Sequence, residues 1–201
     1  MVELSDAISS RERVLQTAEQ LFSERGYAAV TLRDIASALN IKQASLYYHA
    51  PGGKEELFVE VTERALERHR AGLNNIMQQA DGNLRSQLRA AARWLLSQPV
   101  MNYGRMLQSD LRAISEMQAE RLRASAYFAL IAPLQTVFES NLPSDSAASS
   151  RAGHLAGAFL SMIEGIQNLP EHFSAEPRAA MADFLIDTWV DGLQPNGNIH
   201  T

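Results

Sequence analysis

Apolar residues recur three and four positions apart along almost the whole chain, and this spacing limits the possible folds more than any other feature of the sequence. Such spacing places apolar side chains on one face of an α-helix, whereas a half-buried strand needs strict alternation, which is hard to find here. Ser9 with Glu12 and Thr31 with Asp34 have the spacing of helix-capping boxes. The sequence therefore predicts an all-α fold of about nine helices and no strands.

The composition is that of a folded protein, with 46% hydrophobic and 20% charged residues. The net charge is -5, so a basic surface for nucleic acid would have to be local. The absence of cysteine excludes disulfides and thiolate metal sites. Glu3 and Asp6 are atypical of a secretory signal, and no stretch approaches the roughly 18 apolar residues of a membrane-spanning helix. We expect a cytoplasmic protein without membrane segments.

Turn and stop signals divide the first 57 residues into short helices. Gly26 ends the first helix, and Thr31 starts the second. Asn40 suits a left-handed turn, and the third helix can run only over about 42–49 because Pro51 and two glycines stop it. Two short helices joined by a tight turn have the form of a helix-turn-helix.

The polar side chains of the third helix suit contacts with DNA. In a helix-turn-helix the second of the two helices enters the major groove, where glutamine can bond bidentately to adenine and serine can bond several bases. Gln43 and Ser45 lie near the start of this helix. Tyr47 and Tyr48 could be core residues, but adjacent residues cannot both point inward. Residues 11–54 carry six basic and four acidic residues, a local charge of +2.

Three motifs strengthen this interpretation. They are Phe22, Glu24, Arg25, Gly26 and Tyr27; Thr31, Ile35 and Ala36; and Leu46, Tyr47 and Lys54. With these motifs residues 11–57 resemble the tetracycline-repressor (TetR) family of bacterial transcription regulators. The resemblance implies base contacts by Gln43 and Ser45, and phosphate contacts by Tyr47, Tyr48, His49 and Lys54. The full predicted DNA-binding set is Thr31, Arg33, Lys42, Gln43, Ala44, Ser45, Tyr47, Tyr48, His49 and Lys54. The chain departs from the family at Asn40, commonly a glycine, and in "PGGK", which adds about one residue before Lys54.

The same resemblance implies two domains: residues 1–53 bind DNA, and residues 54–201 bind a ligand and dimerise. Further helices are expected from Lys54 for about seven turns, over 84–98 and 100–111, from Ser115 onward with a kink at Pro133, over 150–169, and from Pro177 onward. Soft and aromatic side chains could be ordinary packing, or could line a pocket for an effector that is at least partly apolar. The candidates are Met101, Tyr103, Met106, Met117, Tyr127, Phe128, Phe159 and Met162, with Gln167 and Asn168 as polar anchors.

The last two predicted helices carry small residues and an apolar stripe that a monomer would struggle to cover. We therefore predict a homodimer whose interface includes Ala152, Ala156, Phe159, Ile163, Met181, Phe184, Leu185 and Trp189. Asp183, Asp187 and Asp191 are expected to face water.

No motif for catalysis, cofactor binding or metal binding is evident. The chain lacks the serine-hydrolase elbow, the zinc-protease motif and the phosphate-binding glycine loops, and its histidines lack metal-ligand spacing.

We predict a ligand-responsive regulator that binds a palindromic DNA operator and releases it when a small molecule binds, with repression as the default outcome. The alternative is a helical ligand-binding or scaffolding protein without specific DNA recognition. A small helical enzyme would leave the first 57 residues unexplained.

Overall fold

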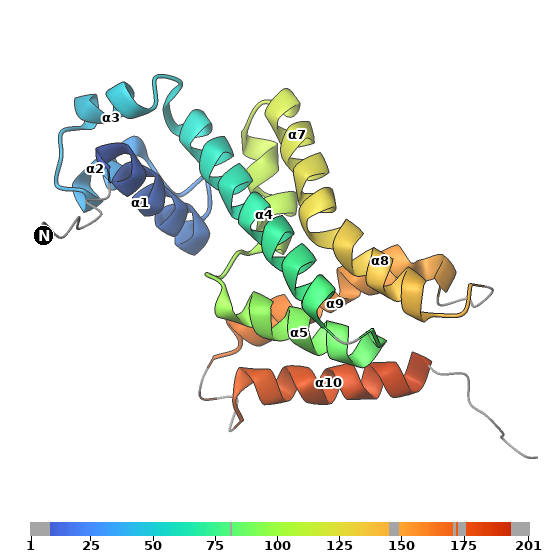
Figure 1. The fold of residues 1–201 in the computed structure, drawn as a ribbon. Helices are drawn as coiled ribbons and strands as arrows, with labels where there is room; N and C mark the ends of the chain where they lie inside the picture. The colour runs from blue at the N-terminus through green and yellow to red at the C-terminus, as the bar shows by residue number, and fades with distance from the viewer. Residues whose placement is uncertain (1–8, 81, 145–148, 171, 173–175, 194–201) are drawn as a thin grey trace, which may run out of the picture. The chain divides into compact units, whose positions relative to one another are not determined.

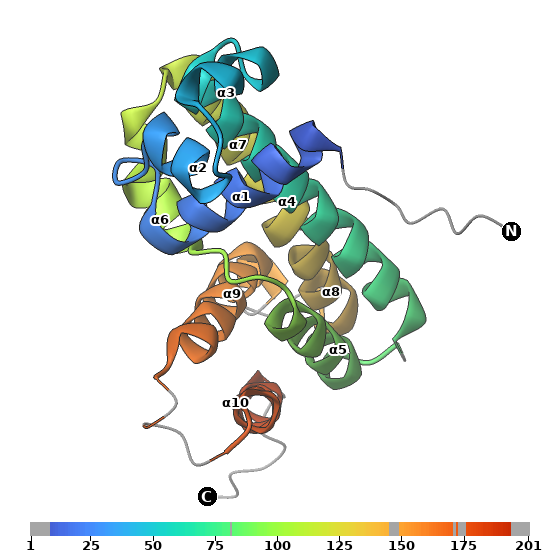
Figure 2. The same cartoon turned by 90° about the vertical axis from the view of Figure 1, so that its left-hand side faces the viewer.

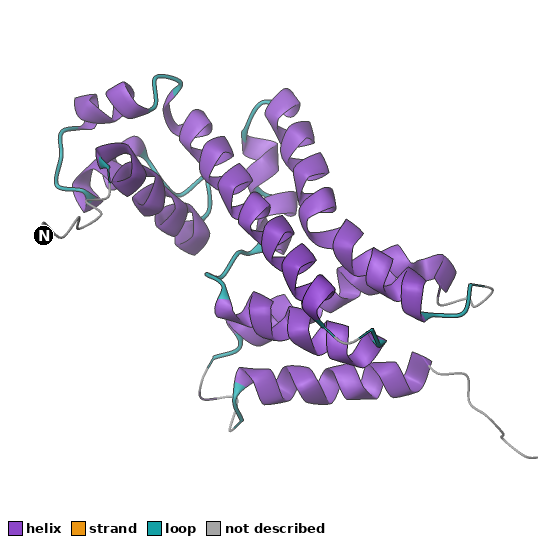
Figure 3. Cartoon of the chain, viewed as in Figure 1, coloured by secondary structure: helices purple, strands orange, loops and turns teal. Residues whose placement is uncertain are grey.

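The computed structural model describes residues 9–80, 82–144, 149–170, 172 and 176–193. Over these residues the chain is helical, with loops between the helices and no strand (Figure 3), which confirms the predicted all-α class. None of the described helices is both long and apolar enough to span a membrane.

Packing divides the chain into two compact units, which are described separately. Among the described residues, unit 1 contains those up to Ala65 together with those of Asn102–Arg123, and unit 2 contains those of Leu66–Met101 and those from Ala124 onward. Helix α4 (Gly53–Gln79) contributes residues to both units. The packing units therefore do not coincide with the predicted functional division between residues 53 and 54, which stays a prediction.

Unit 1 is assembled around the N-terminal helices (Figures 1 and 2). Its elements are α1 (Ser10–Arg25), α2 (Leu32–Ala38), α3 (Gln43–His49), the first part of α4, α6 (Tyr103–Gln108), the 3-10 helix η1 (Asp110–Ala113) and most of α7 (Glu116–Ala126). The rings of Phe22, Tyr27 and Phe58 pack together, with centroids 4.9–6.1 Å apart. Ile35 and Leu46 anchor α2 and α3 in the same core, where both are fully buried.

Unit 2 is a bundle of the remaining helices. Its elements are the rest of α4, α5 (Leu84–Ser97), the last residues of α7, the π-helix η2 (Tyr127–Ile131), α8 (Ala132–Asn141), the 3-10 helix η3 (Ser149–Arg151), α9 (Ala152–Asn168) and α10 (Arg178–Leu193). Helix α5 contacts α8, α9 and α10, and α8 lies along α9. Leu88, Phe138, Phe159 and Ile186 are fully buried at its centre.

The disturbance predicted at Pro133 takes the form of a π-helical turn, η2 (Tyr127–Ile131), which follows α7 and precedes α8. Proline has no N–H to donate within the helix, and its ring clashes with the preceding turn. A π turn is one way in which a helix absorbs such a defect.

The expectation that the aspartates of α10 face water is confirmed only for Asp191, whose side chain is 69% exposed; those of Asp183 and Asp187 are 27% and 36% exposed. Three arginines of α5 pair with three aspartates of α10, in reverse order along the two helices: Arg85 with Asp187 and Asp191, Arg89 with Asp183 and Asp187, and Arg93 with Asp183, at 2.5–3.6 Å. Both sets recur every four residues, so each forms a row along its helix. We call this set the arginine–aspartate ladder. The hydrogen bond from Arg85 lowers the pKa of Asp187 below its ordinary value.

The four α9 residues predicted at a dimer interface are instead buried inside a single chain. Ala152, Ala156, Phe159 and Ile163 have exposed fractions of 0–2%. They belong to the face of α9 that packs within unit 2, so no second copy is needed to cover them. The prediction for these four residues is therefore corrected.

Candidate nucleic-acid interface

Helix α2 begins with a complete capping box. The Thr31 backbone N–H donates to Asp34 Oδ2 at 2.8 Å, and the Asp34 N–H donates back to Thr31 Oγ1 at 3.2 Å. The Thr31 hydroxyl also donates to the carboxylate at 2.6 Å, and this bond lowers the pKa of Asp34. Reciprocal bonds of this kind satisfy backbone groups that a helix N-terminus leaves free. The start of α2 is thus set by its own sequence.

The turn between α2 and α3 has the predicted left-handed residue. Asn40 has a φ of 54°, the only positive φ of a non-glycine residue in the described ranges. Its N–H donates to Ser37 O at 3.0 Å, and the next N–H, of Ile41, donates to Ala36 O at 3.0 Å. Asparagine tolerates this conformation better than most residues. These bonds close α2 and redirect the chain into α3.

Helix α3 buries one side chain and exposes most of the others. Leu46 is 1% exposed and holds the helix against the core, whereas Gln43, Ala44 and Ser45 are exposed. Tyr47 is 49% exposed and Tyr48 is 87% exposed. A seven-residue helix that exposes this many polar and aromatic side chains is suited to insertion into a groove rather than to internal packing.

Arg33 and Lys42 of the predicted set are also exposed, but His49 and Lys54 are bonded within the chain. The imidazole Nε2 of His49 is hydrogen-bonded to Ser10 Oγ at 3.3 Å. Lys54 Nζ donates to Tyr27 O at 2.9 Å and lies 4.0 Å from the centroid of the Tyr27 ring. In this structure Lys54 therefore tethers the connection between α1 and α2, rather than standing free on the DNA-facing surface.

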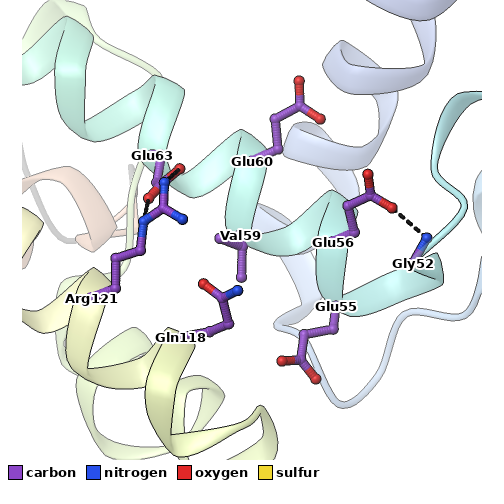
Figure 4. A pocket seen from close by; sticks show the side chains of 8 residues that line it. All are labelled: Gly52, Glu55, Glu56, Val59, Glu60, Glu63, Gln118 and Arg121. Atoms are coloured by element: carbon purple, nitrogen blue, oxygen red, sulfur yellow. Dashed lines mark hydrogen bonds and ion pairs between the residues drawn. The ribbon is translucent and has the colours of Figure 1, made fainter.

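An acidic groove of about 460 Å³ lies between α4 and α7 in unit 1 (Figure 4). Its lining residues are Gly52, Glu55, Glu56, Val59, Glu60, Glu63, Gln118 and Arg121. Each of the four glutamates has a partner: Glu55 accepts from Ser115, Glu56 from the Gly52 N–H, Glu60 from Arg11 and Glu63 from Arg121. In the described part of the chain, no group of three acidic, histidine or cysteine residues could hold a metal ion.

A second groove, of about 360 Å³, lies in unit 2 beside the start of α5 and the end of α10. It is lined by Asn83, Leu84, Arg85, Asn141, Leu142, Pro143, Val190 and Leu193. None of the ten predicted effector residues lines either groove.

The predicted effector residues are divided between the two units. Tyr103, Met106 and Met117 belong to unit 1, and the other seven belong to unit 2. Met106 and Phe159 are buried, whereas Met117, Tyr127 and Phe128 are 44–74% exposed. The amide groups of Gln167 and Asn168 donate to the backbone oxygens of Leu95 and Glu164. The ten predicted effector residues were chosen by residue type alone, and their environments in the structure differ.

Two residues that touch the helix-turn-helix were missed in the sequence. Arg105 binds the last carbonyls of α1, and Asp110 binds the Tyr27 N–H. They lie about 80 residues away along the chain, so no local spacing links them to the motif. The one local signal of this contact is Gly26, because a glycine leaves space for the side chains of Arg105 and Asp110.

Comparison with known proteins places the first helices in a described family. Residues 14–61 match the family model described as "Bacterial regulatory proteins, tetR family". The HTH-type transcriptional regulator LmrA of Bacillus subtilis is 28% identical over 160 residues, which cover 78% of this chain and 83% of LmrA. The negative transcriptional regulator IcaR of the biofilm operon icaADBC of Staphylococcus epidermidis is 45% identical over 53 residues, only 28% of its length.

Solved structures share the fold over almost the whole chain. A TetR transcriptional regulator from Legionella pneumophila superposes with a TM-score of 0.72 at 26% identity, covering 90% of this chain and 97% of that one. The regulator AibR, solved with isovaleryl coenzyme A and operator DNA, superposes with a TM-score of 0.69 at 19% identity, covering 89% and 96%. The similarity therefore extends beyond the first three helices to both units.

Proposed function

We propose that this chain, a member of the TetR family of bacterial regulatory proteins, represses transcription by binding a palindromic operator through α3. Its relatives are transcriptional regulators rather than enzymes. The observation that carries the proposal is the surface of α3, where Gln43, Ser45, Tyr47 and Tyr48 are exposed on a helix anchored by Leu46. Gln43 and Ser45 are proposed to contact bases, and the tyrosines to contact the phosphate backbone.

A second copy of the chain is proposed to dimerise through α9 and α10. Met181, Phe184, Leu185 and Trp189 of α10 are not buried by the single chain, and Phe184 is 69% exposed. By their spacing they lie apart from the buried residues and from the ladder aspartates of the same helix. On α9, Leu155, Ala158, Met162 and Gly165 also remain at least partly exposed and share one face. A two-fold dimer through these stripes would carry two α3 helices to two successive half-sites.

Release of the operator is proposed to follow the binding of a small molecule outside the helix-turn-helix. The fold accommodates both kinds of ligand in AibR, whose structure holds a coenzyme A ester and operator DNA. A ligand that prefers one spacing of the two α3 helices would shift the population toward that spacing. If that spacing no longer matches successive major grooves, operator affinity falls.

Titration of the chain against DNA from its own upstream region, at several salt concentrations, tests the proposal. A regulator should bind one inverted-repeat site with log affinity that falls linearly with log salt, because phosphate contacts by cationic side chains such as Arg33 and Lys42 release counterions. Ser45→Asp is a suitable negative control, since it adds a charge on the exposed face of α3 without touching the core. Absence of sequence-selective, salt-dependent binding would favour the scaffolding alternative.

A further inference from the structure

A segment outside the helix-turn-helix reaches the end of α1. Arg105 of α6 donates from Nη2 to Phe22 O at 2.9 Å and to Ser23 O, and from Nη1 to Glu24 O at 3.5 Å. The last carbonyls of a helix have no partner within the helix and carry partial negative charge. The guanidinium group of Arg105 therefore caps α1 from a separate element; Figure 2 shows α6 beside α1.

Asp110, the first residue of η1, binds the next part of the chain. Its carboxylate is buried, with 5% of the residue exposed. Oδ1 accepts from the Tyr27 N–H at 2.9 Å, and Oδ2 lies 3.5 Å from Arg105 Nε. A buried carboxylate that lost these partners would be costly, so the bonds specify where this backbone N–H must lie.

Gly26 lies at the closest approach of these side chains. It has a φ of +81°, a backbone conformation that residues other than glycine rarely adopt. A Cβ atom on Gly26 would lie 3.1 Å from Asp110 Oδ1 and 3.2 Å from Arg105 Nε, inside ordinary contact distance. The backbone conformation and the space are therefore both matched to Arg105 and Asp110, which we call the α1 clamp.

Tyr27 is held from the other side by α4. Its carbonyl accepts from Lys54 Nζ, and its ring packs against Phe58 with centroids 4.9 Å apart. The backbone of the α1–α2 connection is thus bonded to η1 through its N–H and to α4 through its carbonyl. Helix α2 begins five residues later and packs directly on α3.

We propose that Arg105 and Asp110 are positioning residues for operator binding, which hold the α1–α2 connection, and through it α2 and α3, in the conformation that fits DNA. They lie apart from the exposed surface of α3 and are not expected to touch DNA. The proposal rests on the proposed function for its DNA readout. If loss of the clamp reduces the fraction of free protein in the DNA-binding conformation to about one tenth, the apparent Kd for the operator rises about tenfold.

Three single variants test this with operator DNA. Asp110→Ala removes both acceptors and should weaken binding to the operator and to its single-base variants by the same factor, about tenfold or more, with an unchanged salt slope. Asp110→Asn keeps an oxygen that can accept from the Tyr27 N–H and should restore much of the affinity. Arg112→Ala, an exposed arginine of the same 3-10 helix, is the matched control and should bind like wild type.

Hydrogen exchange on the free protein separates this proposal from the proposed function. In Asp110→Ala the amides of Tyr27, α2 and α3 should exchange faster, whereas those of α5 and α9 should not change. This readout holds even if no operator is found. Should Asp110→Ala fail to fold, Arg105→Gln must show the same pattern. A folded clamp variant with wild-type exchange in α2 and α3, or with operator affinity within about twofold of wild type, would overturn the proposal.

Discussion

Two phenylalanines of unit 2 can be used to test its core and its proposed dimer surface separately. Phe159 of α9 is 0% exposed, and Phe184 of α10 is 69% exposed. The sequence grouped both in one interface, and the structure assigns them different environments. Replacing each of them by alanine should therefore affect two different equilibria, folding and association.

The expected magnitudes follow from burial. Truncating a fully buried phenylalanine to alanine costs about 3–5 kcal/mol, because transfer free energy is lost and a cavity remains. This is a large part of the roughly 5–15 kcal/mol by which a domain is stable. Phe184→Ala removes a ring that the single chain leaves mostly in water, so the free energy of unfolding of the monomer should change by no more than about 0.5 kcal/mol.

The two equilibria can be measured separately. Phe184→Asp should sediment as a monomer at micromolar concentration, where the wild type is expected to sediment as a dimer. In this monomeric background, urea unfolding followed by circular dichroism should give a midpoint that does not depend on protein concentration, and Phe159→Ala should lower it strongly. In the wild-type background the midpoint should rise with concentration, because unfolding then includes dissociation.

Two results would refute the reasoning. If Phe159→Ala cost less than about 1 kcal/mol, the packing described around α9 would be wrong. If Phe184→Asp remained a dimer with wild-type affinity, the interface would lie elsewhere than on this face of α10. Asp183→Asn, on the adjacent ladder face, is a control for the effect of altering an α10 side chain and should leave the dimer intact.

Three further predictions concern single side chains. Gln43→Ala should flatten the preference at one base pair of each half-site by about 1–3 kcal/mol with little change in salt slope, measured by titration against single-base operator variants; uniform loss for every sequence would contradict a base contact. Lys54→Ala should weaken all sequences alike without lowering the salt slope, because the ammonium group is bonded to Tyr27; a slope reduced by about two per dimer would instead indicate phosphate contacts. For Asp187, the hydrogen bond from Arg85 lowers the pKa, so its stabilising contribution is present above the ordinary value of 3.8 and is lost as pH falls through the lowered pKa. Below about pH 4, the free energy of unfolding of Asp187→Asn should therefore fall less steeply with decreasing pH than that of the wild type. The same pH dependence in both proteins would contradict this prediction.

The sequence by itself determined the helical class, the helix-turn-helix and much of its local geometry. Thr31 and Asp34 form their capping box, and Asn40 takes the left-handed turn. These features depend on residues within four positions of one another, so local spacing is sufficient to predict them.

Only the tertiary structure decided which side chains meet across the chain. The ladder aspartates are polar residues on a helix, and nothing in their own segment shows that Arg85, Arg89 and Arg93 lie opposite them. Phe159 and Phe184 are both apolar at helical spacing, but periodicity gives the direction of a side chain only within its own helix. Which face a neighbouring helix covers depends on packing between distant segments, and that left one ring buried and the other exposed. Arg105 and Asp110 meet Gly26 for the same reason: their contact exists only once residues about 80 positions apart have folded together.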